Sequence, residues 1–97
     1  MKNRSKIEIL NIILETSRSG TTKTRIMYHA LLSYRQLVEY MKILQENDLL
    51  KYEEGRQLYC VTEKGLRFLA SLNEINELLS SKSSDYLPIN MGIKNNS

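Results

Sequence analysis

Few side chains in this 97-residue chain have the types and spacing that catalysis or metal binding requires. The chain has one His, His29, and one Cys, Cys60, whereas a structural zinc site takes four His or Cys ligands at defined spacings. The adjacent carboxylates Glu53 and Glu54 would point to opposite faces of a strand, so they would not work together as a general acid and base. The sequence has no phosphate-binding loop and no recognisable nucleophile–base motif. We therefore expect no enzymatic activity, no metal site and no cofactor.

His29 and Cys60 also have simpler explanations. His29 falls at the end of a predicted helix, where a cation complements the helix dipole, or it faces solvent. Cys60 falls within a predicted strand, where a Cys commonly packs as a small apolar residue. A disulfide between two subunits is the alternative function for Cys60.

The basic side chains point to a different chemistry, the binding of an anionic partner. Residues 1–45 carry eight basic and three acidic groups, a net charge of +5, whereas residues 46–97 carry six basic and eight acidic groups, a net charge of −2. The overall charge of +3 hides this asymmetry. The N-terminal half is therefore expected to present a face to a polyanion, although solvated charge scattered by chance remains an alternative.

Three helices are predicted in this basic half. Residues 5–17 have a Ser–Glu capping-box spacing and a broad apolar stripe at helical spacing. A break that ends at Gly20 precedes a short helix over residues 23–30, capped by Thr21 or Thr22. Ser33 then caps a third helix, about 34–46, whose inward side is formed by Leu37, Tyr40, Met41 and Leu44.

The second half changes period and predicts two short strands and a last helix. Alternating residues from Leu50 and a β-rich run over 58–61 flank a Gly-containing turn, which is typical of a β-hairpin. Thr62 caps a helix of about 63–81, in which Leu66 and Leu69 are expected to face the core. A second stripe on this helix has heptad spacing and predicts a dimer interface, although it could instead pack within one subunit; its members are Phe68, Leu72, Ile75 and Leu79.

The expected architecture is thus mainly α with a small β-hairpin, in the order helix, helix, helix, strand, wing, strand, helix. Residues 1–81 would form one domain, and residues 82–97, rich in Ser and Asn, a flexible tail. The longest apolar run, residues 58–61, is too short to cross a membrane. We expect a cytoplasmic, nucleoid-associated protein.

The segments TTKTRIMYHALLSYRQLVEYMKILQENDLL and YCVTEKGLRFL resemble archaeal winged helix-turn-helix proteins, which include small dimeric chromatin-type and regulator-like members. The resemblance covers about residues 7–79. It implies binding to double-stranded DNA, with the third helix in the major groove and the wing, residues 53–58, on the DNA backbone. It also implies a homodimer formed through the last helix, which is short for that purpose here.

The chemistry of the residues agrees with this implication. An Arg side chain forms two hydrogen bonds to a guanine edge, while hydroxyl and basic groups at helix starts suit phosphates. We expect base contacts from Tyr34, Arg35, Glu39 and Lys42. We expect phosphate contacts from Thr22, Lys23, Arg25, Ser33, Gln36, Arg56 and Gln57.

Transcriptional regulation is the leading hypothesis for function. A chromatin-associated protein that binds DNA without sequence preference is one alternative. A winged-helix adaptor that binds protein and not DNA is the other.

Overall fold

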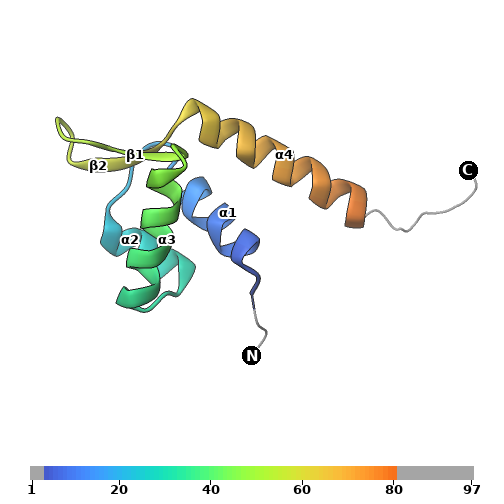
Figure 1. Ribbon diagram of the computed structural model, residues 1–97, viewed down its shortest axis with the longest axis horizontal. Helices are drawn as coiled ribbons and strands as arrows, with labels where there is room; N and C mark the ends of the chain where they lie inside the picture. Colours follow the sequence, from blue (N-terminus) through green and yellow to red (C-terminus); the bar gives the residue numbers. More distant parts are fainter. Residues whose placement is uncertain (1–3, 81–97) are drawn as a thin grey trace, which may run out of the picture.

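The computed structural model describes residues 4–80 and confirms the predicted order of elements. Three helices, α1 (Lys6–Thr16), α2 (Lys23–Ala30) and α3 (Tyr34–Glu46), precede a hairpin of β1 (Leu50–Glu53) and β2 (Leu58–Val61). The chain continues into α4 (Glu63–Ser80), which extends away from the hairpin past α1 (Figure 1). The proposed tail, residues 82–97, lies outside the described residues.

Side-chain caps set the helix starts. In two complete capping boxes, Ser5 pairs with Glu8 at the start of α1 and Ser33 with Gln36 at the start of α3. The Ser33 hydroxyl accepts from the Gln36 amide at 3.2 Å, and the Ser33 amide donates to Gln36 Oε1 at 3.0 Å. These reciprocal bonds satisfy main-chain donors that the first helical turn leaves free, which explains why the sequence located both helices well.

The turn between α2 and α3 depends on Leu31. Leu31 closes α2 in the left-handed conformation, with φ of 54°, and its side chain is exposed. Leu32 then turns into the core. The left-handed residue reverses the chain within three positions and brings α3 against α2.

One apolar core joins all four helices and the hairpin. Fully buried side chains come from each helix, including Ile13 and Leu14 of α1, Ile26 of α2, Leu44 of α3 and Leu69 of α4. The predicted inward side of α3 is confirmed, because all four of its members are buried. The core therefore fixes the back of α3 and leaves its opposite side exposed.

The hairpin is antiparallel, and its register pairs Tyr52 with Tyr59. Their ring centroids lie 4.8 Å apart, so the two side chains contact each other across the hairpin. A third chain segment joins the sheet at one residue, because Thr21 forms an isolated antiparallel bridge with Tyr59. The sequence left open whether Thr21 or Thr22 caps α2; Thr22 does so, and Thr21 belongs to the sheet edge.

The first half of α4 packs on the domain. The Thr62 hydroxyl accepts from the Gly65 amide at 2.9 Å, which confirms the predicted cap, and donates to the Asp48 carbonyl at 2.7 Å. Leu69 is buried as expected, but the prediction for Leu66 was wrong, because 40% of that side chain is exposed. The helix packs on the core through the side that carries Leu69 and Phe68. Leu66 lies on another side of the helix and is therefore exposed to solvent. No helix within residues 4–80 is long and apolar enough to cross a membrane.

Candidate nucleic-acid interface

The start of α2 presents cations beside free main-chain donors. Thr22 caps the helix by accepting from the Arg25 amide at 3.2 Å, and Lys23 and Arg25 occupy its first turn, both exposed. No acidic side chain lies in that turn. Cations oppose the helix dipole here, so they do not serve helix stability. An external phosphate would meet two cations and the exposed N–H groups together.

The outward side of α3 carries the four side chains expected to read bases. Tyr34, Arg35, Glu39 and Lys42 are all exposed, and the residues between them that turn inward fill the core. Within residues 4–80, no ion pair involves Arg35 or Lys42. Both cations are thus available to an external acceptor.

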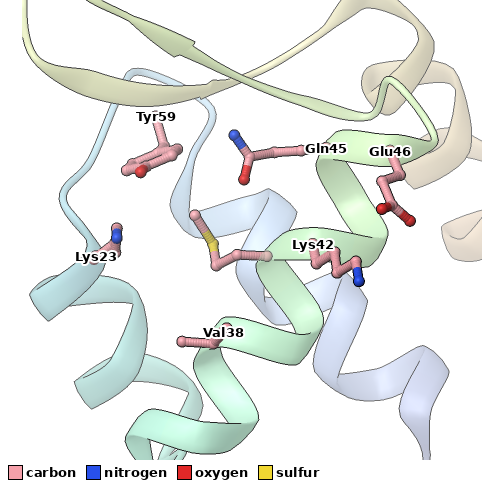
Figure 2. Close-up of a pocket in the computed structure, with 7 residues that line it drawn as sticks. Lys23, Val38, Lys42, Gln45, Glu46 and Tyr59 are labelled. Atoms are coloured by element: carbon pink, nitrogen blue, oxygen red, sulfur yellow. The ribbon is translucent and has the colours of Figure 1, made fainter.

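A hollow of about 400 Å³ separates this helix from the start of α2 and from β2. Val38, Met41 and Tyr59 give it apolar walls, and Lys23 and Lys42 stand at its rim. Val38 and Gln45 point from α3 toward the side where Lys23 and Tyr59 lie (Figure 2). The hollow therefore brings one predicted phosphate contact, Lys23, and one predicted base contact, Lys42, to the same surface.

The wing is held differently from the expectation. Arg56 Nε lies 3.2 Å from a carboxylate oxygen of Glu53, and Arg56 Nη2 donates to the Ser19 carbonyl at 3.2 Å. The guanidinium thus bridges the wing to the loop before α2, although about half of the side chain stays exposed. Glu53 also lies 4.0 Å from Lys51 Nζ, so its charge is balanced by two neighbours. Gln57, in the left-handed region with φ of 57°, is exposed at the end of the turn.

The two hydroxyl groups and the amide expected to bind phosphate already have structural roles. Thr22 and Ser33 each accept a hydrogen bond as caps, which leaves their hydroxyl hydrogens available to donate to an external oxygen. Gln36 Oε1 accepts from the Ser33 amide, so only its NH₂ group is available.

The heptad stripe of α4 divides into two parts. Phe68 is half-buried against the domain core, and Leu72 is half-buried beside α1. Ile75 and Leu79 are 50% and 80% exposed. A second hollow of about 390 Å³ lies between α1 and α4, with Ile7 and Leu72 among its walls. The apolar surface thus runs from this hollow to the end of α4.

Catalytic and metal-binding groupings are not evident in the described part of the chain. No set of three His, Cys, Asp or Glu side chains within residues 4–80 could hold a metal ion. His29 is exposed, and Cys60 is buried, as expected for a Cys packed in a strand.

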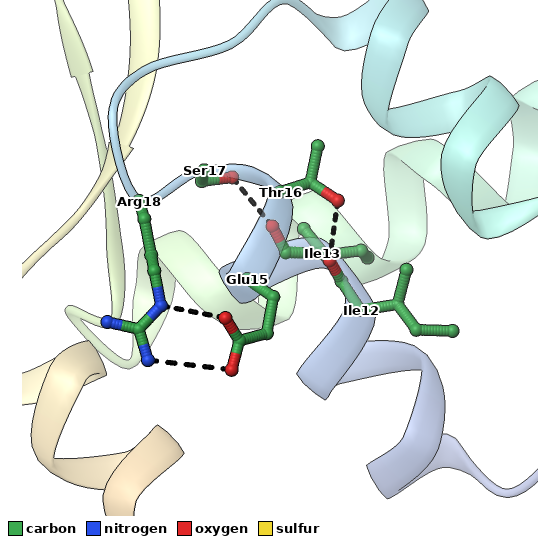
Figure 3. Close-up of polar contacts among 6 residues, drawn as sticks. All are labelled: Ile12, Ile13, Glu15, Thr16, Ser17 and Arg18. Atoms are coloured by element: carbon green, nitrogen blue, oxygen red, sulfur yellow. Dashed lines mark hydrogen bonds and ion pairs between the residues drawn. The ribbon is translucent and has the colours of Figure 1, made fainter.

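The clearest titration effect belongs to an ion pair at the end of α1. Arg18 Nε lies 2.7 Å from Glu15 Oε1 (Figure 3). The hydrogen bond from Arg18 lowers the pKa of the Glu15 carboxyl, and the carboxylate raises the pKa of Arg18. The pair joins side chains three positions apart at the end of one helix, so it affects stability more than recognition.

Comparison with known proteins identifies the family. The model of the winged helix-turn-helix family matches residues 3–80. The chain belongs to the winged helix-turn-helix family. An uncharacterized protein of Methanocaldococcus jannaschii is 35% identical over 80 residues, which cover 81% of this chain and 80% of that protein. The crystal structure of Sso10a-2, a DNA-binding protein from Sulfolobus solfataricus, matches with a TM-score of 0.68 and 28% identity, over 79% of this chain and 83% of that one.

Both relatives of this winged helix-turn-helix protein are archaeal, which agrees with the resemblance seen in the sequence. The sequence had not marked Val38, Gln45, Glu46 or Tyr59 as site residues, yet all four line the hollow beside α3. Charge and hydroxyl chemistry pointed to the other residues, whereas Val38 and Tyr59 gave no such signal. The position of Val38, one helical turn before Lys42, was the available clue.

Proposed function

We propose that this winged helix-turn-helix protein binds double-stranded DNA and acts as a transcriptional regulator. The observation that carries the proposal is the exposure of Arg35 and Lys42 on α3, with Lys42 lining the same hollow as Lys23 at the start of α2. The α3 side chains would enter the major groove, and the α2 cations would contact a flanking phosphate. The DNA-binding relative Sso10a-2 supports this proposal.

Within α3, the chemistry of each side chain suggests its role. Arg35 would bond a guanine edge through two hydrogen bonds, and Glu39 would accept from a cytosine amino group. Tyr34 and Lys42 would contact the neighbouring positions. Thr22, Ser33, Gln36 and Gln57 would add phosphate contacts that set the register of the protein on the duplex.

Arg56 is the weakest of the proposed phosphate contacts. Its guanidinium already bonds Glu53 and the Ser19 carbonyl, so a phosphate would have to compete with those partners. The wing would approach the DNA backbone mainly through its exposed turn.

We further propose a homodimer in which the two α4 helices pack together. Ile75 and Leu79 are largely exposed and continue the stripe begun by Phe68 and Leu72. Residues 75–79 alone would bury too little surface for a stable dimer, and the exposed side chain of Ile7 on α1 would enlarge the contact. A two-fold dimer would present two α3 helices to two half-sites of one duplex.

A salt-titrated binding assay on random and genomic duplexes tests the function. DNA binding predicts a steep loss of affinity as salt rises, because each neutralised phosphate releases counterions. In a regulator that reads sequence, Arg35→Ala would remove about 1–3 kcal/mol of discrimination at one base position. In a chromatin protein the same change would weaken binding on all sequences equally. Failure to bind any duplex at low salt would contradict the proposal and favour a protein-binding adaptor.

A further inference from the structure

The hollow beside α3 contains an exposed apolar side chain in a charged surface. Val38 is 45% exposed, whereas Met41, three residues later on α3, is buried and only 5% exposed. The aromatic side chain of Tyr59 lies across the hollow on β2 (Figure 2). Val38 is therefore the more exposed of the two apolar side chains that α3 contributes to this hollow.

The side chain of Val38 is well suited to meet a small apolar group. A β-branched residue in a helix has one strongly preferred χ1 rotamer, so its two methyl groups are already fixed before any partner arrives. Contact with them would cost little side-chain entropy. A long flexible apolar residue at the same position would not be pre-ordered in this way.

Lys42 stands one helical turn after Val38 and also lines the hollow, and its side chain extends away from Val38 in the view of Figure 2. The Cβ atoms of residues at this spacing lie about 5–6 Å apart. The flexible four-carbon side chain of Lys42 can turn toward Val38 and bring its ammonium donor beside the apolar surface. In the major groove, thymine alone presents a methyl group, on C5, next to an acceptor, O4. Cytosine presents an amino donor at the corresponding place, which would face the Lys42 ammonium unfavourably, and guanine presents acceptors without a methyl group.

We propose that Val38 is a specificity-determining residue that contacts the 5-methyl group of a thymine, while Lys42 bonds the O4 atom of the same base or an acceptor of its neighbour. The hollow would receive the thymine edge, with Met41 and Tyr59 behind the methyl group and Lys23 near the adjoining phosphate. This inference rests on the proposed DNA-binding function. The proposed contact predicts a preference for A·T pairs that depends on the 5-methyl group of the thymine.

The test removes that methyl group from the DNA. One random-sequence duplex library is prepared with thymine and again with uracil, which changes only C5 and leaves base pairing intact. The affinity of the full-length chain for each library is measured by fluorescence anisotropy at one low salt concentration. We expect binding to uracil DNA to be weaker by about fourfold for each buried methyl contact.

Two variants assign the effect to the protein. Val38→Ala should bind the two libraries with a smaller difference in affinity than the unchanged protein, because it loses both γ-methyl groups and keeps only Cβ for the contact. This variant should fold, since Ala has the higher helix propensity. The matched control is Ile43→Ala, because Ile43 is also partly exposed on α3 but does not line the hollow. It should retain the thymine preference of the unchanged protein.

The outcomes separate the two proposals. Equal binding of the unchanged protein to both libraries would overturn the thymine contact and leave DNA binding intact. A thymine preference that is undiminished in Val38→Ala would also overturn it, because the methyl groups of the DNA would then act through DNA shape. Binding to neither library would overturn the thymine contact together with the proposed function.

Discussion

The main chains of Thr21 and Tyr59 are joined by two reciprocal hydrogen bonds. The Thr21 amide donates to the Tyr59 carbonyl at 2.9 Å, and the Tyr59 amide donates back to the Thr21 carbonyl at 2.8 Å. Thr21 directly precedes the cap of α2, and Tyr59 lines the hollow beside α3. The bridge therefore fixes the hairpin relative to the start of α2, where the proposed phosphate-binding cations lie.

Thr21 provides a stability prediction. It is 3% exposed, and within the described residues its hydroxyl oxygen has no hydrogen-bond partner. Thr21→Val keeps the shape and the two main-chain bonds but removes the buried hydroxyl, so we expect the free energy of unfolding to rise by about 1 kcal/mol. Chemical denaturation followed by circular dichroism measures the change.

The neighbouring position is the control for this prediction. Thr22→Val is the same substitution, but it removes the cap of α2 and should lower the free energy of unfolding by about 1 kcal/mol. Equal destabilisation by both variants would show that the Thr21 hydroxyl has a partner in solution.

The salt dependence of DNA binding should distinguish free from occupied cations. Lys23→Ala and Arg25→Ala should each reduce the slope of log K against log salt concentration by about one. Arg56→Ala should change the slope by less than half as much, because its guanidinium bonds Glu53 and the Ser19 carbonyl. An equal reduction in all three variants would mean that Arg56 leaves these partners when DNA binds.

Close packing between α4 and the loop before β1 makes Gly65 sensitive to substitution. A Cβ atom at this position would collide with the main-chain carbonyl of Leu49 and lie 2.6 Å from Val61 Cγ2. Gly65→Ala should therefore lower the free energy of unfolding by about 1–3 kcal/mol. At Gly55 a Cβ atom would meet nothing within 4 Å, so Gly55→Ala should stay within about 0.5 kcal/mol of the unchanged protein. Thermal unfolding of the two variants side by side provides the comparison, and similar losses would contradict it.

The oligomeric state tests the proposed α4 interface. Ile75→Glu combined with Leu79→Glu places two charges on the exposed stripe and should convert a dimer into a monomer in sedimentation experiments. Both side chains are exposed in the single chain, so the helix content of the monomer should persist. Glu77→Ala, an exposed change on the same helix, should leave the dimer intact. A dimer that survives the double substitution would locate the interface elsewhere.

The Glu15–Arg18 pair predicts a small pH-dependent term in stability. Because the folded protein lowers the pKa of Glu15, the pair stabilises the fold above the pKa of the unfolded chain, and this contribution disappears as the pH falls through the lowered value. The Tm of Glu15→Gln should lie slightly below that of the unchanged protein at neutral pH and equal it at strongly acidic pH. The difference should be small because the pair is exposed and screened by solvent. A constant difference at all pH values would rule out the ionised pair as its source.

The sequence predicted those elements whose signals are local. Ser33 and Thr62 marked helix starts through caps, and a Gly-containing turn between β-rich runs marked the hairpin. It did not predict the bridge at Thr21, because a single paired residue has no periodicity. Leu66 was placed in the core for a related reason: helical spacing shows which residues share a face but does not show where a neighbouring element leaves that face uncovered.

In the candidate site, too, the sequence predicted the residues with local signals and missed those whose role depends on distant contacts. Charge and capping chemistry pointed to Lys23, Arg25, Arg35 and Lys42 on the outside of two short helices, and all four are exposed there. The folding of Arg56 back onto the Ser19 carbonyl depends on a contact across 37 positions, which no local pattern encodes. The role of Val38 needed the position of β2 opposite α3 before an apolar residue could be related to recognition.

The uneven attachment of α4 has a mechanical consequence. A helix of 18 residues is about 27 Å long, and only its first half is held by buried side chains such as Leu69. A tilt of about 10° in the remaining half would displace its end by roughly 2 Å, with the domain unchanged. If two copies join at that end, small bending there alters the separation of their α3 helices. Bending of α4 would then let the two α3 helices of a dimer match half-sites whose spacing varies with the local twist of the duplex.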